Sequence, residues 1–193
     1  MPASNEQVAR QQRIAQVLAC AEAAGAMQTG FDMTLAWARD RYSFGRPLAS
    51  YQALKHRFAD MKMWLEASHA ITAAAAVAVS NTSVSNTSVG GPADGDQARH
   101  ADEMASAAKA YLGHFGPQLM HECVQLHGGI GLTKELDLHL YLRRVTTNAM
   151  LYGTPADHRQ RLADHAGHHA HADHADHADH ADLADQAKRP DAR

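Results

Sequence analysis

The sequence has few of the features that mark several large protein classes. Its two cysteines, Cys20 and Cys123, provide neither a disulfide framework nor a metal-ligand spacing, which suits a reducing cytosol. The N-terminal residues lack the apolar core of a signal peptide, and no apolar run reaches the roughly 18 residues of a membrane span. With 18 basic and 21 acidic residues, the net charge is only −3. This balance favours neither nucleic acid nor a membrane as a partner, so we expect a cytoplasmic protein.

Helical periodicity is the main pattern in the sequence. Aromatic residues make up only 6% of the chain and alanine is abundant, which favours helix over strand. Apolar residues recur at spacings of three and four in three long segments, which predict helices over Glu6–Arg41, Tyr51–Val79 and Gln97–Leu126. The segment 136–142 alternates like a strand, but a lone strand among long helices would have no partner, so we predict a fourth helix there.

A shorter helix is predicted from Pro155, a residue suited to a first helical turn, to about Ala166. The fold class is therefore all-α: an up-and-down four-helix bundle with a short extra C-terminal helix and a disordered tail.

Two low-complexity segments interrupt or follow this pattern. Residues 80–96 contain a tandem Ser-Asn-Thr-Ser-Val repeat and a Gly-Gly-Pro, and we interpret them as a flexible insertion. Residues 167–193 repeat His-Ala-Asp, and a helical histidine ladder of this kind could chelate a divalent metal weakly. We favour a repeat expansion without a role and assign no metal site. The expected domains are a bundle over 1–166 and a tail over 167–193.

Three short motifs stand at the joints between predicted helices. The first is Arg41-x-x-Phe44-Gly45, followed by Gln52. The second is Gln125-x-x-Gly128-Gly129-x-Gly131, and the third is Tyr152-Gly153-Thr154. In this order and on these helices, the motifs resemble the signatures of the C-terminal helical domain of acyl-CoA dehydrogenases, over roughly Arg10 to Ala166. That family oxidises acyl-CoA thioesters with FAD.

The resemblance implies a set of cofactor contacts. It implies that Arg41 reaches the FAD of a neighbouring subunit, and an arginine suits a phosphate because it gives bidentate, charge-assisted hydrogen bonds. The glycine pair lets the backbone approach a ligand closely. Thr154 matches a threonine near the flavin diphosphate of its own subunit. The expected FAD-binding residues are Arg41, Ser43, Phe44, Gln52, Gln125, Gly128, Gly129 and Thr154.

The catalytic base of the family is not evident. Its reaction removes an α-proton to a glutamate and transfers a β-hydride to the flavin. In most members the glutamate precedes the Gly-Thr pair, where this chain has Tyr152, and a phenol is a poor base at neutral pH. The alternative position, on the first helix, falls near Ala15. The family also usually has an aspartate where this chain has Arg144.

Three explanations of the missing base are open. A partner chain could bring it, as in the paired acyl-CoA dehydrogenases of actinobacterial steroid breakdown; Asp157 or another carboxylate could substitute; or the chain could be a degenerate relative. The domains that precede this bundle in the family are also absent although Met1 begins the chain, which suggests a truncated product or one piece of a split enzyme.

The resulting functional hypothesis is a flavoprotein oxidoreductase chain in lipid or steroid catabolism. It takes part in FAD-dependent α,β-dehydrogenation of an acyl-CoA, within a homo- or hetero-oligomer of acyl-CoA dehydrogenase-type chains. The resemblance implies electron-transfer flavoprotein as the acceptor. The alternative is a non-catalytic helical dimerisation module derived from that family.

Overall fold

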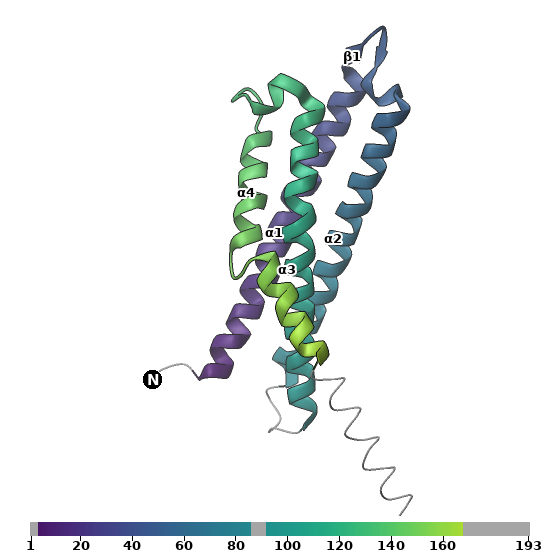
Figure 1. Cartoon of the computed structure of the whole chain (residues 1–193). Coiled ribbons are helices and arrows are strands. Elements are labelled where there is room, and N and C mark those ends of the chain that lie inside the picture. Colours follow the sequence, from purple (N-terminus) through teal and green to yellow (C-terminus); the bar gives the residue numbers. More distant parts are fainter. Residues whose placement is uncertain (1–3, 86–91, 168–193) are drawn as a thin grey trace, which may run out of the picture.

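The computed structural model describes residues 4–85 and 92–167, and it confirms the all-α class. Four helices pack side by side, and a further helix over 155–167 follows them (Figure 1). The four are the long helices α1 (Asn5–Asp40), α2 (Gln52–Ser85) and α3 (Pro92–His127) and the shorter α4 (Leu138–Met150). Two short 3-10 helices, η1 (Leu48–Ser50) and η2 (Gly128–Leu132), stand before α2 and after α3. In the described part of the chain, no helix is long and apolar enough to cross a membrane.

Local signals explain the ends of α1. The Ser4 hydroxyl accepts a hydrogen bond from the Gln7 backbone N–H, and the Gln7 side chain accepts one from the Ser4 N–H. This capping box satisfies two groups that would otherwise lack partners at the start of the helix. The helix ends at Arg41, which is extended and donates its N–H to the Trp37 carbonyl. The sharp stop places the first motif directly beyond the bundle.

The core consists of two clusters along the bundle. One is built from large side chains, including Met27, Phe31, Leu65 and Leu119, and it lies under the end that carries the first two motifs. The other is rich in alanine on α1, α2 and α3, where small side chains bring the helices close together. The larger core side chains thus lie at the end of the bundle that carries the first two motifs.

Helix α3 is continuous through Gly113, Gly116 and Pro117. A Cβ at Gly113 would lie 2.5 Å from the ring of Pro155, and one at Gly116 would lie 2.9 Å from Val145. These glycines therefore allow α4 and the start of the C-terminal helix to pack against α3.

Some helix boundaries in the structure differ from those predicted from the sequence. The segment 136–142 does lead into a helix, α4, and the C-terminal helix begins at Pro155 as predicted. The loop assigned to 80–96 is too long, because α2 continues to Ser85 and α3 already begins at Pro92. Serine, asparagine and threonine are weak helix formers, but they are tolerated where a long helix is already propagating. Residues 86–91 and the tail 168–193 lie outside the described residues.

Candidate cofactor-binding site

The first motif forms a hairpin that the sequence pattern did not predict. Strands β1 (Tyr42–Ser43) and β2 (Arg46–Pro47) pair antiparallel, with Phe44 and Gly45 at the turn. Both turn residues have positive φ, 51° at Phe44 and 79° at Gly45, as a type I′ hairpin turn requires. A phenylalanine rarely adopts this conformation, and its side chain is 97% exposed. A strained backbone that presents an apolar ring to solvent is typical of a contact surface.

The hairpin is fixed to the start of α2. The Tyr51 hydroxyl donates a 2.7 Å hydrogen bond to the Ser43 carbonyl, and the Arg46 guanidinium lies 3.8 Å from the centre of the Tyr51 ring. Gln52 follows on the exposed first turn of α2, with its amide 3.4 Å from His56. The backbone of Ser43 is therefore an anchor of the hairpin, while Gln52 remains at the surface.

Arg41 lies at the base of the hairpin. Its guanidinium is 5.7 Å from the centre of the Trp37 ring, within the range of a cation–π contact. The Trp37 ring in turn stacks on His127, with 5.5 Å between centroids and 22° between the planes. Within residues 4–85 and 92–167, no carboxylate forms an ion pair with Arg41. Its hydrogen-bond donors are thus available to an anion from outside.

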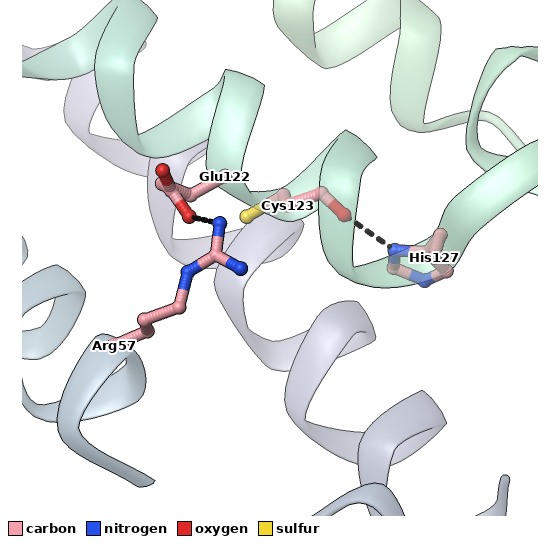
Figure 2. A network of polar contacts seen from close by, with 4 residues as sticks. All are labelled: Arg57, Glu122, Cys123 and His127. Atoms are coloured by element: carbon pink, nitrogen blue, oxygen red, sulfur yellow. Dashed lines mark hydrogen bonds and ion pairs between the residues drawn. The ribbon is translucent and has the colours of Figure 1, made fainter. Parts of the chain in front are cut away.

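The second motif leaves the end of α3 beside this arginine. His127 is the last residue of the helix, and its Nδ1–H donates to the Cys123 carbonyl at 2.8 Å (Figure 2). Gly128 has a φ of 67°, and a Cβ added at Gly128 or Gly129 would meet no atom within 4 Å. Gln125 is exposed on the preceding turn. This stretch therefore presents open backbone, as a close approach to a ligand needs.

An ion pair ties α2 to α3 next to this turn. Figure 2 shows the Arg57 guanidinium on α2 donating to the carboxylate of Glu122 on α3, one residue before Cys123. The pair joins the helix that carries Gln52 to the helix that carries Gln125. Sequence reasoning could not find it, because 65 positions separate the partners.

The third motif forms a turn at the other end of α4 (Figure 1). Tyr152 and Gly153 have φ values of 62° and 114°. The Tyr152 carbonyl accepts hydrogen bonds from Gln16 Nε2 at 3.4 Å and from His158 Nε2 at 3.2 Å. The Tyr152 side chain takes no part in these contacts and is 46% exposed. The turn is therefore held through its main chain.

Thr154 and Asp157 cap the C-terminal helix. The Asp157 carboxylate accepts from both the N–H and the hydroxyl of Thr154, each at 2.8 Å, and the Asp157 N–H donates back to the hydroxyl. These hydrogen bonds, first from the Thr154 backbone, hold the pKa of Asp157 below its usual value. A carboxylate of low pKa that is engaged in a helix cap is a poor proton acceptor. Its hydrogen bonds to Thr154 therefore make Asp157 unsuitable as a substitute base.

Glu22 is also engaged. On α1 it accepts from Asn148 Nδ2 at 2.9 Å and forms an ion pair with Arg144 Nε at 3.3 Å, both from α4. Glu22 and Arg144 line an open cavity of about 630 Å³ between α1 and α4, together with Tyr141 and Arg143. Ala15, the alternative position for a base, brings no carboxylate to α1.

The predicted residues thus fall into two groups. Arg41, Ser43, Phe44 and Gln52 meet Gln125, Gly128 and Gly129 at one end of the bundle, where the Trp37–His127 stack joins the two motifs. Thr154 lies apart, beyond α4. Trp37 and His127 carried no signal of their own in the sequence, since their role depends on packing between helices. In the described ranges, no three His, Cys, Asp or Glu side chains cluster in a way that could hold a metal ion.

Comparison with known proteins decides the family. The family model described as acyl-CoA dehydrogenase, C-terminal domain, matches residues 9–167. The chain belongs to this family. Acyl-CoA dehydrogenase IpdE2 of Mycolicibacterium smegmatis is 36% identical over 148 residues, which are 77% of this chain and 41% of that protein. The chain thus spans about two fifths of the length of this acyl-CoA dehydrogenase.

Solved acyl-CoA dehydrogenase structures share the fold. The ChsE4–ChsE5 complex of Mycobacterium tuberculosis superposes with a TM-score of 0.63 at 20% identity, over 81% of this chain and 38% of that one. A steroid acyl-CoA dehydrogenase variant gives a TM-score of 0.63 at 24% identity, over 82% and 39%. At these identities the likeness shows the fold of the helical domain alone.

Proposed function

We propose that this chain contributes part of an FAD site to a larger assembly that dehydrogenates an acyl-CoA thioester between its α and β carbons. The observation that carries the proposal is the surface formed by Arg41, Phe44, Gly128 and Gly129. It combines an arginine without an ion-pair partner in the described residues, an exposed aromatic ring and open glycine backbone.

These residues suit a flavin dinucleotide chemically. A diphosphate needs charge-assisted donors, which Arg41 offers, and an aromatic ring system gains from an exposed ring such as that of Phe44. The backbone at Gly128 and Gly129 has room for a bound group, since nothing lies within 4 Å of either added Cβ. Ser43, Gln52 and Gln125 would complete the contacts from the neighbouring turns.

Thr154 fits less well as a donor to a phosphate. Its hydroxyl hydrogen is directed to Asp157, and the same hydroxyl accepts the Asp157 N–H. We therefore assign Thr154 first to the helix cap and only then to the surface that would face the flavin of its own subunit.

The bound FAD would supply the hydride acceptor, and this chain would supply binding and orientation. No carboxylate stands at Tyr152 or Ala15, while Asp157 and Glu22 are held by Thr154, Asn148 and Arg144. We propose that the base comes from a second acyl-CoA dehydrogenase-type chain. The existence of the ChsE4–ChsE5 complex, whose helical domain has the same fold, supports an assembly of this kind. Electron-transfer flavoprotein is the proposed acceptor, and a steroid-derived or other lipid acyl-CoA is the proposed substrate class.

The test is the FAD content of the assembled protein. The full chain, tagged and expressed in its source organism, is purified with the chains bound to it, and released FAD is measured per chain. We expect bound FAD in the wild type and a loss of affinity of roughly 10- to 100-fold in Arg41→Ala, the range of a lost charge-assisted hydrogen bond. Arg39→Ala, on the last turn of α1, is the matched control and keeps its FAD. A colourless homo-oligomer would instead favour the dimerisation module.

A further inference from the structure

Three side chains from the two motif-bearing segments form a continuous stack. The Arg41 guanidinium lies over Trp37 at 5.7 Å, and Trp37 lies on His127 at 5.5 Å. Arg41 begins the hairpin, whereas His127 directly precedes Gly128, so the stack joins the end of α1 to the end of α3. Within the described residues no hydrogen bond joins the hairpin to η2, so side-chain packing is their link.

His127 has little freedom at its place in this stack. It is 5% exposed, and its ring donates from Nδ1 to the Cys123 carbonyl one turn earlier. The η2 turn rests on it, because a Cβ at Gly131 would lie 3.1 Å from the Cβ of His127 and 2.7 Å from the Val124 carbonyl oxygen. The η2 turn is therefore packed directly against the residue that carries the stacked ring.

The stack also restricts Arg41. Its guanidinium carbon lies 5.7 Å from the centre of the Trp37 ring, and cation–π attraction favours positions of the charged group near that ring. No carboxylate among the described residues pairs with Arg41, so its N–H groups remain available for charge-assisted hydrogen bonds to a phosphate.

We propose that Trp37 and His127 are a positioning pair that couples the hairpin to the η2 turn and so sets Arg41 and the Gly128–Gly129 backbone in one fixed geometry. This inference rests on the proposed function in one respect, namely that both segments face the same cofactor. The coupling itself is a property of this chain and can be measured without the cofactor.

A second stacked aromatic pair in the bundle lies away from the motifs and provides a control. Trp64 on α2 and Phe115 on α3 stack at 5.6 Å and 29°, which is nearly the same geometry, but neither residue adjoins a motif. Trp64→Leu is therefore the matched control for Trp37→Leu, since both remove an indole from a stacked pair.

The experiment is amide hydrogen exchange of the full chain, read separately for residues 42–47 and 128–132. Trp37→Leu should raise exchange in the distant segment 128–132, and His127→Leu should raise it in 42–47, each by roughly three- to tenfold, the range of an aromatic pair. The double variant should add little to either single change. Trp37→Tyr, which keeps an aromatic face, should restore wild-type exchange.

Two outcomes would overturn the coupling. Trp37→Leu could raise exchange in 42–47 alone, or it could raise exchange equally in all the described helices, as we expect of Trp64→Leu. Titration of FAD into the assembled protein separates this inference from the proposed function. If each variant changes exchange only in its own segment, the positioning pair is refuted. If the wild-type protein holds no FAD, the proposed function is refuted, and the exchange result still decides whether the pair couples the two segments.

Discussion

The ammonium group of Lys109 on α3 donates a 2.5 Å hydrogen bond to the carbonyl oxygen of Asn148 near the end of α4. It also lies 3.4 Å from the carbonyl of Ala149. Lys109 is only 2% exposed, and burial lowers its pKa. A cation at this place satisfies helix-end carbonyls and interacts favourably with the helix dipole. It thereby fixes the end of α4 from which the Tyr152 turn departs.

Replacing Lys109 with methionine should destabilise the fold by about 1–3 kcal/mol, because two buried carbonyls lose their donor while the side-chain volume is kept. Urea unfolding measures the change. Lys62→Met is the control, since the exposed Lys62–Glu66 pair contributes about 0–1 kcal/mol. A Lys109→Met variant at least as stable as the wild type would contradict this account and would mean that the cost of burying the ammonium dominates.

The Thr154 cap gives a second prediction. Thr154→Val removes the hydroxyl that bonds Asp157 but keeps the branched shape, and it should cost about 0.5–2 kcal/mol, as other lost N-caps do. The loss should appear as faster amide exchange in the helix 155–167. Thr146→Val, at an exposed position on α4, is the comparison and should change little. Unchanged exchange in that helix would show that Thr154 does not cap it.

The pH dependence of stability should reveal His158. Burial first, and then the positive charges of Arg161 and Lys109, lower the pKa of this histidine below its ordinary value of 6.5. Above that value both the folded and the unfolded states are neutral at His158. Below it the unfolded chain takes up the proton first, so stability is lost as the pH falls towards the folded-state pKa.

His158→Gln should therefore show a shallower loss of Tm than the wild type between about pH 6.5 and pH 5, because glutamine has no proton to take up. His165, which faces Asp102 and Glu103, is present in both proteins and cancels in the comparison. Parallel curves for the two proteins would rule out the assigned role of His158.

Both thiols should be inert in the folded chain. Burial raises the pKa of Cys20 to about 11 and that of Cys123 to about 12. The thiolate is the reactive form, so a thiol reagent at about pH 8 should label neither residue until the chain unfolds. Labelling in denaturant provides the control. Rapid stoichiometric labelling of the native protein would show that one of the two sites opens.

Much of the architecture could be predicted because long amphipathic periods and the three motifs act locally. The hairpin at Phe44–Gly45 could not, since its strands have two residues each and Phe-Gly is not a common turn pair. The continuation of α2 to Ser85 was missed for a related reason, because weak helix formers were judged without the helix that precedes them.

Only part of the candidate site could be predicted from the sequence. The motif residues could be named from their pattern, but the residues that hold them in place lie far away along the chain. Lys109 meets Asn148 across 39 positions, and Gln16 meets Tyr152 across 136. Such partners arise from packing, so they become evident only when the bundle is assembled.

The central claim is that Arg41 and the surface beside it bind FAD within an assembly. The most direct measurement is the FAD released per chain from purified assemblies of wild type, Arg41→Ala and Arg39→Ala. The account predicts bound FAD in the wild type and in Arg39→Ala, and less FAD per chain in Arg41→Ala, because the lost charge-assisted hydrogen bond lowers the affinity roughly tenfold or more. Equal FAD content in all three, or none in the wild type, would contradict it.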